Sequence, residues 1–259
     1  MHSTRPVVFA LLCAALLGDG RSAKAAEGAV LPLPAEDLKE ITARLGPGVV
    51  GQPLPSAPIG DPSTYFPLQE RVGKYRVTAG DKTGSIQELT VKKGQRPIGH
   101  PAWRFALSPS LAGFINQAPN GDLMMPAISD AGEGVIVVTT PANPFLLAGM
   151  QPGETRRFSQ SVAVNYLDDP TSRDYSGALK GSYTYLGTYQ VTVPAGTYPA
   201  ILMRLKYSGK VGPAHTEDLA YYFFAPQVGV VAMISQEDVE AFWIIHIDTK
   251  SGKVLLPSG

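Results

Sequence analysis

The sequence predicts a mainly β protein in which a short N-terminal helix precedes a curved antiparallel sheet, a meander shaped like a half-barrel. Two observations support this prediction. Beyond residue 64, short runs of β-branched and aromatic residues alternate with Gly, Pro and Asp turn signals, and long amphipathic helical patterns are missing. The runs follow one another through short connections, which favours antiparallel neighbours with one dry face and one wet face.

Residues 1–26 have the pattern of a secretory signal peptide, so we expect the mature protein to work in the periplasm or as a secreted protein. The basic Arg5 precedes the apolar run Val7–Leu17, which is too short to span a bilayer because a spanning helix takes about 20 residues. A small-x-small pattern follows this run. It predicts cleavage after Ala25 or Ala26.

The single cysteine, Cys13, lies inside this segment. Leu12 precedes it, whereas lipid attachment needs a small residue there, so a lipoprotein is not predicted. The mature chain then has no disulfide, thiol nucleophile or cysteine-ligated zinc. The chain has a formal net charge of +0, so it has no basic excess for nucleic acid, and no later apolar run is long enough to span a membrane.

Residues 27–64 predict a proline-rich arm, because dense proline favours extended linker. Within the arm, Ala35–Leu45 predicts a short helix, with Leu38, Ile41 and Leu45 on one face and acidic residues in the first turn. Gly46 and the following proline form a stop signal. We expect this helix to dock on the main body, with flexible chain on either side.

Residues 65–259 predict one antiparallel β domain. Its expected strands are Arg71–Ala79, Ser85–Lys92, Trp103–Ser108, Gly134–Thr140, Ser182–Val193, Thr197–Tyr207, Asp218–Phe224, Gly229–Ser235 and Ala241–Asp248. Asn120-Gly121 predicts a tight hairpin within Phe114–Ala127, since both residues accept a positive φ. In Ser182–Val193 the alternation places Tyr183, Tyr185, Tyr189, Val191 and Val193 on one side of a strand.

Three segments resemble an uncharacterised family of bacterial envelope proteins, a domain of unknown function. Tyr65–Leu68 (YFPL) followed by Val72–Tyr75 resembles the family's YFPL…G opening. Tyr185–Tyr198 contains VTVPAGTY and is similar to its VTVPAGTF hairpin, and Tyr221–Val231 resembles its YWFAPGVGLV segment. Together these motifs cover most of residues 65–235, in the family's order.

The resemblance implies a half-barrel fold similar to the periplasmic lipoprotein-carrier proteins that shelter acyl chains. It implies a shape and no chemistry, because the motifs are a hairpin turn and a bend before a buried strand. The chain departs from the family at two places. Tyr189 and Gln190 stand where the family often has an acid, and Gln227 replaces a usual glycine.

No catalytic residue, metal site or cofactor is predicted. His100 and His215 fall in loop-like stretches and His246 in an apolar strand, so no pair has metal-ligand spacing. Asp168–Asp174 and Glu237–Glu240 are interpreted as solvated surface loops, because the first lacks the spacing of a calcium loop and charge runs are ordinarily solvated. No G-x-S-x-G elbow occurs, although a Ser–His–Asp set from distant loops stays open.

Aromatic residues crowd the last third of the chain, and tyrosines suit a semi-open pocket as well as cross-strand packing. From strand parity, the expected pocket residues are Tyr185, Tyr189, Met203, Tyr222, Phe224 and Trp243. The first hypothesis is therefore a non-enzymatic envelope protein that binds a lipid or another apolar molecule on a concave aromatic face.

Two further hypotheses stay open. The second is an assembly module of the envelope, whose concave face is closed by its own side chains and whose arm docks a protein partner. A dry, packed interior favours this module, whereas an open apolar cavity favours the ligand carrier. The third is an enzyme, which needs His100 or His215 within hydrogen-bonding reach of a serine and an acid.

Overall fold

The computed structural model describes residues 28–95, 101–241 and 245–258, and most of these residues lie in strands. The strands are β1 (Ala29–Val30), β2 (Val50–Ser56), β3 (Arg71–Ala79), β4 (Ile86–Gln95), β5 (Pro101–Ala106), β6 (Leu111–Gln117), β7 (Leu123–Asp130), β8 (Val135–Leu146), β9 (Thr155–Tyr166), β10 (Arg173–Val193), β11 (Gly196–Val211), β12 (Ala214–Ala225), β13 (Gly229–Ala241) and β14 (Ile245–Leu255). The two helices in these residues are α1 (Ala35–Leu45) and α2 (Pro62–Tyr65). None of the described helices has the length and apolar character needed to cross a membrane.

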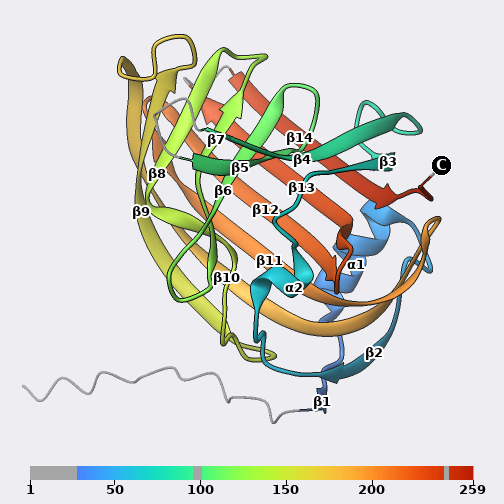
Figure 1. Ribbon diagram of the computed structural model, residues 1–259. Helices are drawn as coiled ribbons and strands as arrows, with labels where there is room; N and C mark the ends of the chain where they lie inside the picture. The colour runs from blue at the N-terminus through green and yellow to red at the C-terminus, as the bar shows by residue number, and fades with distance from the viewer. Residues whose placement is uncertain (1–27, 96–100, 242–244, 259) are drawn as a thin grey trace, which may run out of the picture.

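Twelve of the strands form a closed antiparallel barrel (Figure 1). The order around the ring is β10, β11, β12, β13, β14, β3, β4, β5, β6, β7, β8 and β9, and β9 pairs again with β10. The remaining strands, β1 and β2, extend the sheet beyond the second half of β10. The predicted antiparallel, mainly β fold is thus confirmed, but the sheet closes on itself where a half-barrel was expected.

The ring strands follow one another in sequence order from β3 to β14, and the pairing of β14 with β3 closes the ring. The ring also includes β9 and the first half of β10, the long hairpin drawn in yellow in Figure 1. The sequence predicted no strand over Thr155–Tyr166 or over 173–181, because these stretches are rich in small and polar residues. Where β9 and β10 pair, Phe158 lies directly opposite Gly181 and its ring covers this glycine. A Cβ added to Gly181 would lie 2.5 Å from Phe158 Cζ. An aromatic ring over a cross-strand glycine stabilises this pairing.

A bulge divides β10 into two halves that bury opposite faces. The register shifts between Tyr185 and Gly187, and beyond it β10 pairs with β2 in place of β9. A bulge adds one residue and therefore reverses the alternation. As a result Tyr185 points into the barrel, while Tyr189 and Val191 pack outside it. The prediction that these residues share one side is wrong.

Helix α1 has the predicted bounds and packs against the outside of the barrel, near β13, β14 and β3 (Figure 1). Ile41 and Leu45 are buried in an outer core with Tyr189, but Leu38 is 43% exposed. The buried residue of the first turn is Asp37, whose carboxylate oxygens accept hydrogen bonds from Arg204 Nη1 at 2.8 and 2.7 Å. A charged contact therefore anchors the helix in addition to its apolar face.

The arm is more ordered than expected. It contains strand β2, and the residues after this strand fill one end of the barrel. After β2, Ile59 is fully buried in the interior core. Its backbone N–H donates to Met150 O at 3.0 Å, and Gly149 N–H donates to Ile59 O at 2.6 Å. An eight-stranded barrel is filled by its own strands, whereas a wider barrel is not. Here the segment around α2 and the connection after β8 complete the filling.

Two predicted turns differ in the structure. The hairpin at Asn120-Gly121 is present between β6 and β7, but only Gly121 has a positive φ, at 88°. Ala118 N–H donates to Asp122 O, so the connection is longer than a two-residue turn. The second is the stretch that begins at Glu237. It was interpreted as a solvated turn, but it lies within strand β13.

The turn between β12 and β13 supplies a stability prediction. Gln227 has φ of 63°, a left-handed conformation shared by no other non-glycine residue in the described ranges. Its N–H donates to Thr64 O at 2.7 Å, which holds the turn against α2. We expect Gln227→Gly to raise the free energy of unfolding by about 0.5–1 kcal/mol in urea titrations, since glycine adopts this φ without strain. Gln227→Ala keeps the strain, so an equal gain from alanine would contradict this reasoning.

Candidate ligand site inside the barrel

Strand register identifies the side chains that point into the barrel. Tyr183 of β10 and Met233 of β13 belong to the interior core, and residues directly opposite each other share a face. One row across this inner face consists of Arg156, Tyr183, Leu205, Ala220 and Ser235. The next row toward the β9–β10 hairpin consists of Phe158, Gly181, Tyr207, Asp218 and Glu237.

The end of the barrel around Phe66, Phe145 and Phe224, here called the closed half, is packed solid. Four of the six expected pocket residues lie on its inner face: Tyr185, Met203, Tyr222 and Phe224. The Phe224 ring lies 6.3 Å from Phe66 and 5.4 Å from Phe145, both nearly perpendicular to it. Phe66 and Phe145 therefore occupy the face on which a ligand was expected, and their origin in the α2 segment and at the end of β8 was not predicted.

The other two expected pocket residues do not join this group. Tyr189 faces the outer core beneath α1, because the bulge in β10 reverses its side. Its hydroxyl donates to Leu186 O at 3.2 Å, and burial raises its pKa well above the ordinary tyrosine value. Trp243 lies outside the described residues. A ligand-binding role for the six residues stays a prediction.

The opposite end, here called the open half, is reached by solvent. Ser235 and Glu237 are exposed although both point into the barrel, and Tyr207 and Asp218 are half-buried on the same face. A side chain on the inner face of a closed barrel is exposed only where the interior opens to water. The barrel is therefore a cup with a packed base and an open mouth.

The open half has two unlike walls. Strands β11–β13 contribute the polar side chains of Tyr207, Asp218, Ser235 and Glu237. Strands β6–β9 contribute Leu111, Ile128, Val137 and Val164, all half-buried, of which the first two pack against the interior core. In the ring order these groups of strands lie on different sides of the barrel. Such a lining can hold a molecule with one apolar and one polar side.

Carboxylates shape the electrostatics of the open half. Asp218 and Glu237 are directly opposite each other on neighbouring strands. Although part of the Glu237 side chain reaches solvent, the barrel wall around it partly desolvates its carboxylate and so raises its pKa, and the nearby Asp130 raises it further. Burial also raises the pKa of Tyr207, with Asp218 and Glu237 adding to the shift. These groups make the polar wall unfavourable for an anion.

Lys253 is a buried cation on the inner face of β14, and it supplies a pH prediction. It is 6% exposed, its amine donates to Leu107 O, and burial lowers its pKa to about 8, with Lys82 contributing. An ordinary lysine pKa is higher, so between pH 8 and 10 the unfolded chain binds a proton that the folded chain does not. The stability contributed by this site therefore rises with pH in that window.

We expect Lys253→Met to raise the free energy of unfolding by about 2 kcal/mol at pH 7, because the cost of burying the ammonium exceeds the hydrogen bond that is lost. This advantage should shrink as the pH approaches 10. Urea titrations from pH 7 to 10 measure it, with the exposed Lys206→Met as the control. A difference that stays constant with pH would show that the amine is protonated in the fold throughout.

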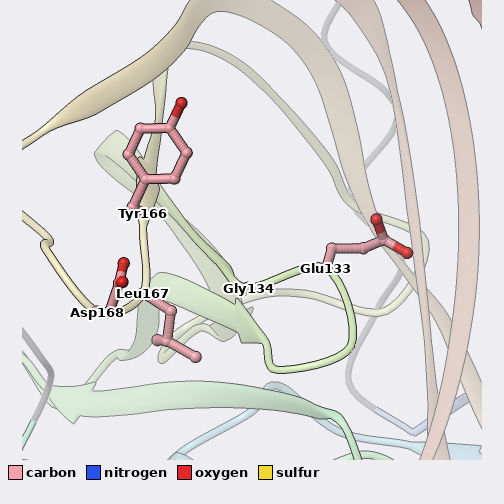
Figure 2. A pocket seen from close by; sticks show the side chains of 5 residues that line it. All are labelled: Glu133, Gly134, Tyr166, Leu167 and Asp168. Carbon is pink, nitrogen blue, oxygen red and sulfur yellow. The ribbon is translucent and has the colours of Figure 1, made fainter.

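A shallow depression of about 550 Å³ lies beside the mouth (Figure 2). It is lined by Glu133, Gly134, Tyr166, Leu167 and Asp168, and Figure 2 shows Tyr166 and Asp168 on one side of Gly134 and Glu133 on the other. The Tyr166 hydroxyl donates to Asp174 at 3.1 Å, and this hydrogen bond raises its pKa. The depression adds further acidic groups next to the opening of the barrel.

Among the histidines, the structure describes the side chain of His215, and it lies away from this site. His215 lies on the outer face of β12, 3.7 Å from Glu217, and both side chains are exposed. His100 and the side chain of His246 lie outside what the structure describes. Within the described residues no group of three His, Cys, Asp or Glu side chains is placed to hold a metal ion.

Comparisons with known proteins do not assign this chain. No family model and no curated protein matches it. Among solved structures, the crystal structure of the hypothetical lipoprotein YmcC from Escherichia coli (K12) overlaps 73% of this chain and 84% of that chain, at 9% identity and a TM-score of 0.38. This structural similarity is too low to assign a fold or a function to the chain.

Proposed function

We propose that this protein is an exported, non-enzymatic binding protein that holds a small amphipathic molecule in the open half of its barrel. The observation that carries the proposal is the exposure of Ser235 and Glu237 on the inner face, opposite an apolar wall. Ligand sites are typically concave and mostly apolar, with a few converging polar groups. The closed half provides the rigid base of this cup.

The two walls orient the ligand. Its apolar part lies against Ile128, Val137 and Val164, and its polar part faces Tyr207 and Asp218. A carboxylate or phosphate would meet the carboxylates of the polar wall and be repelled. The ligand is therefore an uncharged or cationic molecule, which narrows the lipid-like class expected from the aromatic residues.

A neutral fluorescent probe tests this proposal. N-phenyl-1-naphthylamine should bind the purified protein with an increase in its fluorescence. Ser235→Trp fills the open half from an exposed inner position and should abolish binding at unchanged melting temperature. Ser208→Trp places the same side chain at an exposed position on the outer face and should leave binding intact. If the unmodified protein does not bind the probe, the ligand-binding proposal is wrong and the envelope assembly module is favoured.

Export is tested separately from binding. Protein recovered from a periplasmic fraction or from culture medium should begin at Ala26 or Glu27, as N-terminal sequencing or intact mass would show. Retention of Met1 in a cytoplasmic fraction would contradict the signal peptide and leave the binding proposal standing.

A further inference from the structure

Gln160 is a buried polar side chain for which the chain supplies no partner. It is 4% exposed, and within the described part of the chain neither its amide oxygen nor its amide nitrogen has a hydrogen-bond partner. It lies opposite Leu179 on β10, two residues from Phe158, so it points into the barrel. It sits one row closer to the mouth than Tyr207.

A second unpartnered group lies next to Gln160. Thr139 of β8 is 6% exposed, and its hydroxyl oxygen also lacks a partner among the described residues. Thr139 is directly opposite Val162, the next inward-pointing residue after Gln160 on β9. Gln160 and Thr139 are therefore diagonal neighbours on one face, a spacing of about 7–8 Å between backbones.

Inside the barrel, Asn143 Oδ1 and Gln87 Oε1 are also without a partner among the described residues, whereas two buried tyrosine hydroxyls have partners within the chain. The Tyr183 hydroxyl donates to Phe145 O, and the Tyr185 hydroxyl donates to Ala57 O at 3.2 Å. A buried amide without partners destabilises a fold, and leucine of similar size would avoid that cost. Gln160 and Thr139 adjoin the open half, beside the apolar wall of Val137 and Val164. Their polar atoms are covered by neighbouring side chains, so a ligand on this wall reaches them only by displacing those side chains.

We infer that Gln160 and Thr139 bind a second polar group, on the side of the ligand that lies against the apolar wall, and that this group is an uncharged carboxamide. The inference rests on the proposed function and names its ligand class. A glutamine amide presents one acceptor and two donors without charge, which matches another amide edge to edge, and the threonine hydroxyl adds a donor or acceptor. A charged group buried here would lack a counter-ion on its own wall, where the neighbours are Val137, Val162 and Val164.

A matched pair of ligands tests the inference. 2-Naphthamide and 2-methylnaphthalene share one apolar body and differ in the hydrogen-bonding group. We expect the purified protein to bind 2-naphthamide about ten-fold more tightly by fluorescence titration, the value of one to two net hydrogen bonds. Gln160→Leu should remove this preference and raise the melting temperature of the free protein by about 3 °C, because it removes an unpartnered buried amide.

Gln236→Leu is the control, because Gln236 lies opposite Leu219 on the outer face and should not affect the preference. If the unmodified protein binds neither compound, the proposed function fails and this inference fails with it. Equal binding of both compounds, or a preference that survives Gln160→Leu, overturns the inference alone. A lower melting temperature for Gln160→Leu would also overturn it, since the amide would then stabilise the free fold, for example through an internal water.

Discussion

Replacing Asp37 with alanine is expected to lower the free energy of unfolding by about 3–5 kcal/mol, the usual cost of removing one member of a buried ion pair. Asp37 is 2% exposed and accepts two hydrogen bonds from Arg204 Nη1. It also accepts one from the Tyr221 hydroxyl at 2.5 Å. Without the carboxylate, the half-buried guanidinium of Arg204 and the buried hydroxyl of Tyr221 lose their shared acceptor.

Equilibrium unfolding in urea measures this loss. Glu36→Ala is the matched control, since Glu36 lies in the same helical turn and is exposed, and it should change stability by no more than about 0.5 kcal/mol. Unfolding should also release α1 from the barrel, so a probe on the helix should report the same transition. A loss below about 1 kcal/mol for Asp37→Ala would show that apolar contacts alone hold the helix.

Phe66→Ala is expected to cost about 3–5 kcal/mol, because it removes a fully buried aromatic ring from the base of the cup. The Phe66 ring lies 5.3 Å from Phe105 and 4.8 Å from Phe145, both edge to face. The Arg71 guanidinium carbon lies 4.5 Å above it. The backbone around this ring is tied to other segments and cannot collapse freely into the space that alanine would leave.

Urea unfolding of Phe66→Ala and Phe66→Leu separates packing from backbone effects. Leucine fills most of the volume, so its cost should be under about half that of alanine. Val72→Ala is the exposed control on the neighbouring strand, with an expected change within about 0.5 kcal/mol. Similar small costs for all three variants would mean that the base of the barrel is loosely packed and that the closed half is not a fixed floor.

The candidate site was only partly predictable. Alternation correctly placed Tyr185, Met203 and Phe224 on one face, because opposite residues on regular strands share a side. The open half was missed, since the predicted strand ended at Ser235, although the same alternation continues to Glu237 within β13. No sequence pattern indicated Gln160, because its strand lacks a continuous apolar period and its burial depends on neighbours far along the chain.

The sequence by itself determined the local structure: the bounds of α1, the bounds of β3 and the antiparallel strands of the last third. These follow from periodicity, caps and turn residues, which act over a few positions. Only the tertiary structure decided that the sheet closes, which half of the interior is filled, and on which side Tyr189 lies. Closure needs β14 to pair with β3, the filling comes from α2 and the end of β8, and one bulge reverses a face where β10 changes its partner to β2. Each of these depends on contacts between distant segments, which no local pattern encodes.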